Sequence, residues 1–129
     1  MRVALLLTLA WLAGCSSESD AIVGTYSCSA SLGAADGGPA TPELCVEMTG
    51  GKAQDLEDNQ RQCTAAHNTF ARTACPHGGA VAGCRQTSSI GVISSWYYDR
   101  DISADDVRAI CEGLAKLAPA GLKIEFVLP

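Results

Sequence analysis

The cysteines constrain the fold of this chain more than any other feature. Seven cysteines are distributed over 129 residues, and six of them lie beyond residue 20: Cys28, Cys45, Cys63, Cys75, Cys84 and Cys111. Apolar residues make up 47% of the chain, but 20 of them are alanine, whose small side chain contributes little to a hydrophobic core. A small domain with a thin core commonly depends on disulfides, each of which contributes roughly 2 to 4 kcal/mol. Six cysteines can pair in many ways, and their spacing does not select among them.

The first residues have the pattern of an export signal. Arg2 supplies a positive start, and residues 3–11 form an apolar run. This run is shorter than the roughly 20 residues that a membrane-spanning helix needs. The sequence therefore predicts a signal peptide rather than a retained transmembrane helix.

The motif Leu12-Ala13-Gly14-Cys15 resembles the lipobox of bacterial lipoprotein precursors at every position. The resemblance implies a diacylglyceryl group on the Cys15 thiol, cleavage before Cys15 and acylation of the new amine. The alternative is an ordinary secretory signal that is cut near Ala13. By resemblance, Ser16 and Ser17 after the lipidated cysteine favour the outer membrane over the inner membrane.

The lipobox also gives the expected domain organisation. Residues 1–14 are the removed signal peptide, residues 15–21 are the lipidated cysteine with a flexible tether, and residues 22–129 form a single disulfide-rich domain. Because lipidation of Cys15 removes the odd cysteine, an even set of six remains. In an oxidising compartment such a set predicts three disulfides.

The hydrophobic periodicity predicts a mixed fold. Alternation and β-branched residues indicate strands at 22–28, 43–49, 81–87, 91–98 and 122–128, with a hairpin turn near Ser88-Ser89 and a loop at 29–42. Helical spacing predicts helices at 52–67 and from a capping pair, Ser103 and Asp106, to Leu117. Strands and helices do not alternate as βαβ units, and the sequence shows no internal repeat. We therefore expect an α+β fold, with a small antiparallel sheet and two helices packed on one face.

The middle of the chain resembles small uncharacterised cysteine-rich exported proteins of Gram-negative bacteria. The resemblance rests on Cys45-Val46-Glu47-Met48-Thr49-Gly50, Cys63, Cys75-Pro76, Gly83-Cys84 and Trp96-Tyr97-Tyr98. It implies export and disulfides but no activity. Because Cys28 and Cys111 lie outside the matching region, it also implies Cys28 with Cys111 as a tentative pair.

Two cysteines and two histidines form an alternative metal set. Cys63, His67, Cys75 and His77 offer four soft ligands, which suit zinc. A zinc thiolate site needs reduced sulfur, whereas export favours oxidised cysteines. We therefore expect disulfides at Cys63 and Cys75, with no metal and no cofactor.

Catalytic residues are not identifiable from the sequence. Cys75-Pro76-His77 places a thiol near an imidazole, but a cysteine in a disulfide cannot attack a substrate. The acid pairs Asp99 with Asp101 and Asp105 with Asp106 are typical of turns and helix starts. Because no nucleophile elbow, phosphate loop or dinucleotide motif is present, a small envelope hydrolase remains only the alternative function.

Three adjacent aromatic residues are the candidates for recognition. Trp96 and Tyr98 share one face of the predicted strand with Val92, and Tyr97 shares the other face with Ile93. We expect Trp96 to be buried in the core. The alternative is an exposed aromatic platform for a glycan or a protein.

The charge distribution restricts the class of partner. The formal net charge is −5, and the lysines and arginines are scattered singly. Nucleic-acid binding needs clustered cations and is therefore disfavoured. The sequence predicts a non-enzymatic binding or structural domain that is held at the membrane by its lipid anchor, with an envelope protein or a glycan as the candidate partner.

Overall fold

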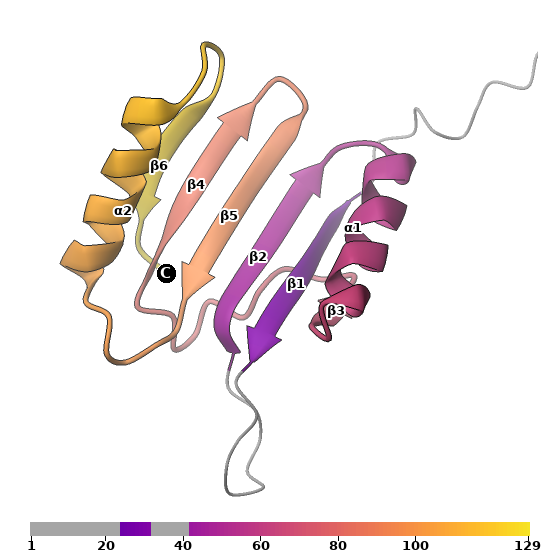
Figure 1. Ribbon diagram of the computed structural model, residues 1–129, viewed down its shortest axis with the longest axis horizontal. Coiled ribbons are helices and arrows are strands. Elements are labelled where there is room, and N and C mark those ends of the chain that lie inside the picture. The colour runs from indigo at the N-terminus through magenta and orange to yellow at the C-terminus, as the bar shows by residue number, and fades with distance from the viewer. Residues whose placement is uncertain (1–23, 32–41) are drawn as a thin grey trace, which may run out of the picture.

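A computed structural model describes residues 24–31 and 42–129. Cys15 and the expected signal and tether lie outside the described residues. Six strands and two helices follow one another as β1 (Thr25–Ser31), β2 (Pro42–Gly50), α1 (Ala53–Ala65), β3 (Thr69–Ala71), β4 (Ala82–Ser88), β5 (Gly91–Tyr97), α2 (Ala104–Leu117) and β6 (Lys123–Val127). The strands form one antiparallel sheet in the order β3-β1-β2-β5-β4-β6 (Figure 1). This architecture confirms the predicted α+β class.

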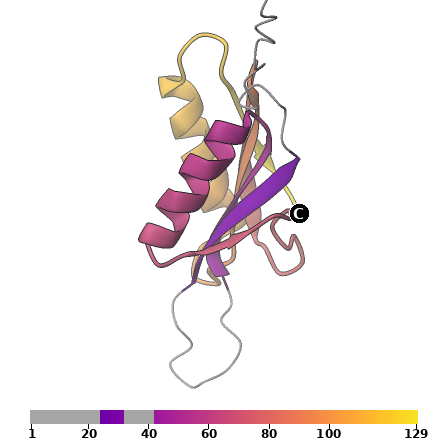
Figure 2. The ribbon, with the colours of Figure 1, turned by 90° about the vertical axis from the view of Figure 1, so that its right-hand side faces the viewer.

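Both helices lie on the same face of the sheet. Residues that are directly paired across antiparallel strands point to the same side, and one such row contains Cys28 and Cys84. Cys28 is bonded to Cys63 of α1, and Cys84 is bonded to Cys111 of α2. Figure 2 shows both helices on one side of the strands. We call this side the helix face.

The chain follows the same ββαβ path twice. β1-β2-α1-β3 and β4-β5-α2-β6 are related by an approximate two-fold axis near the central pair of Val46 with Ser95. Phe70 lies opposite Cys28 on one outer strand, and Phe126 lies opposite Cys84 on the other. The sequence shows no internal repeat, because the halves share little beyond this phenylalanine and the strand-to-helix disulfide.

The connection between the two halves covers the opposite face. Residues 72–81 run from β3 near one edge of the sheet to β4 near the other, behind the sheet in Figure 1. The Cys45–Cys75 disulfide ties this connection to β2. We call residues 72–81 the crossover and the side that it covers the crossover face.

The structure corrects the tentative disulfide between Cys28 and Cys111. The three disulfides are Cys28–Cys63, Cys45–Cys75 and Cys84–Cys111. The tentative pair is wrong because β1 and α2 belong to different halves of the sheet. Each helix is instead bonded to the strand that lies beneath it.

The boundaries of several elements also differ from the expectation. β1 extends through Ser31 and β2 begins at Pro42, so the predicted loop at 29–42 is shorter. α1 ends at Ala65, and His67 has a positive φ of 58°. The amide of Asn68 donates to the carbonyl of Cys63, which completes the helix end. β3 has only three residues and was not predicted.

The second helix begins as the sequence predicts. Ser103 is the N-cap, and its hydroxyl accepts a hydrogen bond from the amide of Asp106. The Asp106 carboxylate accepts hydrogen bonds from the Ser103 hydroxyl at 2.6 Å and from the Ser103 amide at 2.9 Å. These two bonds stabilise the charged form, and they lower the pKa of Asp106. The capping box is confirmed.

Candidate functional site

The aromatic run is divided between the two faces of the sheet. Trp96 is 1% exposed and Tyr98 is 6% exposed, and both lie on the crossover face, where they pack against Cys45 and Cys75. Tyr97 lies on the helix face, against the core beneath α2. The predicted burial of Trp96 is confirmed, but its cover is the crossover rather than a helix. An exposed platform of Trp96 and Tyr98 is therefore not present.

The alternative metal set is not assembled. Cys63 is bonded to Cys28 and Cys75 is bonded to Cys45, so neither sulfur is a thiolate that could bind zinc. The set is wrong because its two cysteines belong to elements on opposite faces of the sheet. In the part of the chain that the structure describes, no group of three His, Cys, Asp or Glu side chains could hold a metal ion.

His77 and Glu47 form the main polar contact of the crossover. The His77 Nε2 atom lies 3.2 Å from each oxygen of the Glu47 carboxylate. The Cys75 amide donates to the same carboxylate at 2.9 Å, and the His77 ring packs on Trp96 with ring centroids 4.3 Å apart. The Tyr98 hydroxyl donates to the carbonyl of Pro76. Together these contacts hold the crossover against the sheet.

This imidazole and carboxylate pair has a structural role. One Glu47 oxygen already accepts from a backbone amide, and the Cys75 sulfur is in a disulfide and cannot act as a nucleophile. Neither His77 nor Glu47 lines any of the three described cavities. Burial and the nearby Glu47 charge both raise the pKa of Tyr98.

The predicted acid pairs also have structural partners. Asp99 accepts a hydrogen bond from the Asp101 amide at 2.9 Å, as is common in turns. Asp106 caps α2, and Asp105 lies 3.8 Å from Arg108 one turn further along the helix. None of these carboxylates faces a described cavity.

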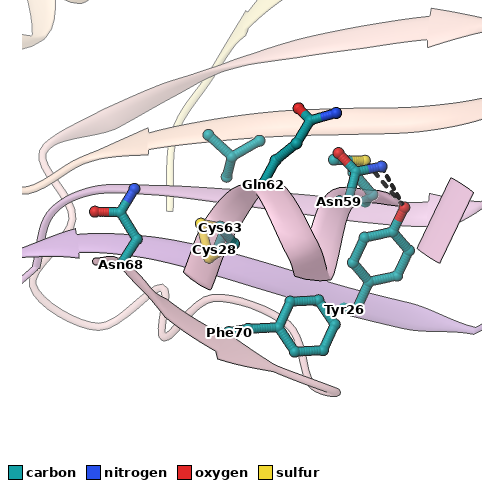
Figure 3. Close-up of a pocket in the computed structure, with 9 residues that line it drawn as sticks. Tyr26, Cys28, Asn59, Gln62, Cys63, Asn68 and Phe70 are labelled. Carbon is teal, nitrogen blue, oxygen red and sulfur yellow. Dashed lines mark hydrogen bonds between the residues drawn. A yellow bond between two sulfur atoms is a disulfide. The ribbon is translucent and has the colours of Figure 1, made fainter. Parts of the chain in front are cut away.

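A pocket of about 270 Å³ lies between α1 and the sheet (Figure 3). Its walls contain two aromatic rings, three side-chain amides, two aliphatic or thioether side chains and one disulfide: Tyr26, Phe70, Asn59, Gln62, Asn68, Val46, Met48 and Cys28–Cys63. None of these described lining groups is charged. The pocket therefore offers hydrogen bonds and apolar contacts but no acid, base or nucleophile.

Tyr26 organises the pocket. Its ring lies 5.9 Å from that of Phe70, and its hydroxyl accepts a hydrogen bond from the Asn59 amide at 3.2 Å (Figure 3). The same hydroxyl donates to the sulfur of Met48 at 3.2 Å. Burial raises the pKa of Tyr26, the Asn59 hydrogen bond lowers it, and the Asp55 charge raises it further. Tyr26 therefore stays neutral at ordinary pH, and its hydroxyl links α1 to β2.

The pocket continues along the sheet into a longer groove. A second cavity shares Tyr26, Met48 and Asn59 with it and reaches Ile90 and Ile93 at the β4–β5 turn. Strands β1, β2 and β5 form the floor of the two cavities, and α1 lines one side; these elements lie next to one another in Figure 1. We call this the helix-side groove. Its floor includes Val46, Met48 and Ile93, and its α1 wall is Asp55, Asn59 and Gln62.

Two apolar side chains of α2 lie away from the side of the helix that contacts β6. The Arg108 guanidinium lies over the Phe126 ring, 4.3 Å from its centroid, so this side of α2 faces the outer strand β6. Successive residues of a helix are rotated by about 100°. Ile110 and Leu114 therefore lie away from the side of α2 that carries Arg108. They remain 37% and 41% exposed.

The exposed apolar residues of α2 were not predicted, because helical spacing indicates a helix but not how much of its apolar side is buried. Within α2 only Val107 and Cys111 are buried. Five of the six large exposed apolar residues of the described chain lie on the β4–β5 hairpin or on α2: Ile90, Ile93, Ile110, Leu114 and Leu117. A stripe with more apolar residues than one helix can bury was the available signal, and such gathered exposure marks an interaction surface.

Comparisons of the chain with family models, with curated proteins and with solved structures found no match. None of the described helices is both long and apolar enough to cross a membrane.

Proposed function

We propose that this protein is a lipid-anchored protein of the bacterial cell envelope whose small domain binds a partner, without catalysis, through the helix-side groove. The observation that carries the binding function is the groove itself. Its floor is partly exposed apolar surface, and the pocket beneath α1 adds uncharged hydrogen-bonding groups. Such a surface provides recognition chemistry rather than proton transfer.

The cysteines support the anchor. The six cysteines of the described residues pair with one another, so Cys15 has no cysteine partner within the chain. An exported protein with a lone cysteine needs another use for that thiol, and the lipobox Leu12-Ala13-Gly14-Cys15 supplies one. Two or more acyl chains make membrane attachment durable. Ser16 and Ser17 favour the outer membrane as its site.

Binding is preferred to the hydrolase alternative because of where the polar groups lie. His77 and Glu47 are the closest approach to a general base, but they secure the crossover and face no described cavity. The helix-side groove lies on the opposite face of the sheet. A partner in the groove would therefore not reach this pair.

The anchor is tested by replacing its thiol. Cys15→Ser removes the sulfur that would receive the diacylglyceryl group, so we expect incorporation of a labelled fatty acid to fall to background. The protein is then expected to leave the membrane fraction or to accumulate as the uncut precursor. Ser16→Ala is the matched control and should retain the label. Fatty-acid labelling of the Cys15→Ser protein at the wild-type level would contradict the anchor.

A further inference from the structure

The three disulfides differ in their exposure to solvent. Five of the six paired cysteines are at most 4% exposed: Cys45, Cys63, Cys75, Cys84 and Cys111. Cys28 is the exception among the described cysteines, because it is partly exposed. Reduction of a disulfide requires a thiolate to reach one of its sulfur atoms. The exposure of Cys28 therefore makes Cys28–Cys63 the bridge that an external thiol can attack.

The pocket beneath α1 gives access to this bridge. Cys28 and Cys63 both line the pocket of about 270 Å³, together with the exposed residue Gln62 (Figure 3). None of the described lining groups is charged, so no carboxylate in the pocket repels an approaching thiolate. The side-chain amides of Gln62 and Asn68 make no hydrogen bond to another described residue, and their N–H groups can stabilise a thiolate.

The other two disulfides are enclosed by the cores of the two faces. Cys45–Cys75 is packed with Trp96 beneath the crossover, and Cys84–Cys111 is packed with Val107 beneath α2. Neither bridge lines a described cavity. A thiolate therefore reaches these sulfur atoms only when the surrounding part of the domain unfolds.

We propose that Cys28–Cys63 is a site of thiol–disulfide exchange, which a dithiol reductant reduces selectively in the folded protein. A thiolate of the reductant forms a bond to the Cys28 sulfur and breaks the bond to Cys63, whose sulfur leaves as a thiolate and takes a proton from water. The second thiol of the reductant gives its proton to water and attacks the mixed disulfide. This step releases Cys28 as a thiolate, which is protonated in turn. The dithiol becomes a disulfide, and its two electrons reduce the bridge to two thiols.

Reduction of this bridge removes the covalent link between α1 and the sheet. α1 buries Leu56 and Cys63, and a hydrogen bond of 3.2 Å from Asn59 to the Tyr26 hydroxyl also joins it to β1. The pocket, rather than a packed core, lies beneath the rest of this helix. Exchange at Cys28–Cys63 therefore releases α1 and opens the pocket. The proposal goes beyond the binding function and does not depend on it.

Limited reduction of the folded, disulfide-intact protein is the direct test. After any free thiol is blocked with iodoacetamide, the protein is treated with dithiothreitol, samples are quenched with acid, and new thiols are alkylated with N-ethylmaleimide. Peptide mass spectrometry then gives the rate at which each cysteine is labelled. We expect Cys28 and Cys63 to be labelled at least tenfold faster than the other four paired cysteines. In concentrated urea, where the fold is lost, the three bridges should be reduced at similar rates.

Two variants with the same substitution locate the route of attack. Gln62→Trp places a large side chain beside the pocket, and Gln60→Trp places one at an exposed position of α1 that lines no described cavity. We expect Gln62→Trp to slow the reduction of Cys28–Cys63 at least fivefold and Gln60→Trp to change it by less than twofold. Circular dichroism checks that both variants are folded. Equal effects of the two substitutions would contradict attack through the pocket.

The remaining outcomes decide selectivity, release and the source of the dithiol. Equal reduction rates of the three bridges in the folded protein, or faster reduction of either enclosed bridge, would overturn the exchange site. Hydrogen exchange of the selectively reduced protein should show loss of protection in α1, and unchanged protection there would overturn its release. A reduced thioredoxin-type protein is tested beside dithiothreitol. Selective reduction by both supports a protein dithiol as the source, and selective reduction by dithiothreitol alone supports a small dithiol.

Discussion

Trp96→Ala is expected to lower the free energy of unfolding by about 3 to 5 kcal/mol, the cost of truncating a large buried aromatic side chain. Trp96 is 1% exposed and packs with Tyr98 and the Cys45–Cys75 disulfide. It also carries the His77 ring, so its loss leaves a cavity beneath the crossover. Because the domain's stability is limited, a loss of this size is a large fraction of the total.

Urea unfolding followed by far-ultraviolet circular dichroism measures this loss, since the variant lacks the tryptophan signal of the domain. Ile90→Ala is the control, because Ile90 is 75% exposed and its truncation should change the free energy by less than about 0.5 kcal/mol. A loss below about 1 kcal/mol for Trp96→Ala would show that the crossover face is not a core.

Removing either helix disulfide is expected to destabilise the domain, with different local effects. The Cys28–Cys63 and Cys84–Cys111 bridges join residues 35 and 27 positions apart. Loop-closure entropy alone gives each bridge about 3 to 4 kcal/mol. Because this contribution is similar for the two bridges, a difference in behaviour between the two double alanine variants reflects how each helix is packed.

The packing differs between the two helices. Beneath α2, Val107 is fully buried among Tyr97, Ile124 and Phe126. Each helix buries two residues, but beneath α1 lies the uncharged pocket, and the described residues form no core cluster there like the one around Val107. We expect Cys28→Ala/Cys63→Ala to release α1 while the sheet stays folded, and Cys84→Ala/Cys111→Ala to leave α2 in place.

Amide hydrogen exchange distinguishes these results. The amides of α1 should lose protection in Cys28→Ala/Cys63→Ala, and those of α2 should keep most of theirs in Cys84→Ala/Cys111→Ala. Equal loss of protection in the two helices would contradict the difference in packing.

The strands and α2 were predictable because their signals are local. Alternating side chains predicted which residues of β5 share a face, and the Ser103 cap predicted the start of α2. The short strand β3 was not predicted, because three residues carry too little periodicity. Its pairing with β1 at Phe70 depends on contacts far apart in the sequence.

The disulfide pairing and the groove depend on the order of the strands, which no local pattern determines. Cys28 meets Cys63 because α1 folds back over β1. The groove exists because β2 and β5 meet at the centre of the sheet while the helices cover its sides. Apolar spacing along α2 predicted the helix but not that Ile110 remains exposed.

Photo-crosslinking in intact cells tests the binding surface most directly. Benzoylphenylalanine is placed at Ile93 in the helix-side groove and, as the control, at Arg85, an exposed residue of β4 on the crossover face. We predict a discrete protein adduct from position 93 and none from position 85, with the crosslinked residue mapped to the partner by mass spectrometry. An adduct from position 85 with none from position 93 would contradict the assignment of the groove as the binding surface.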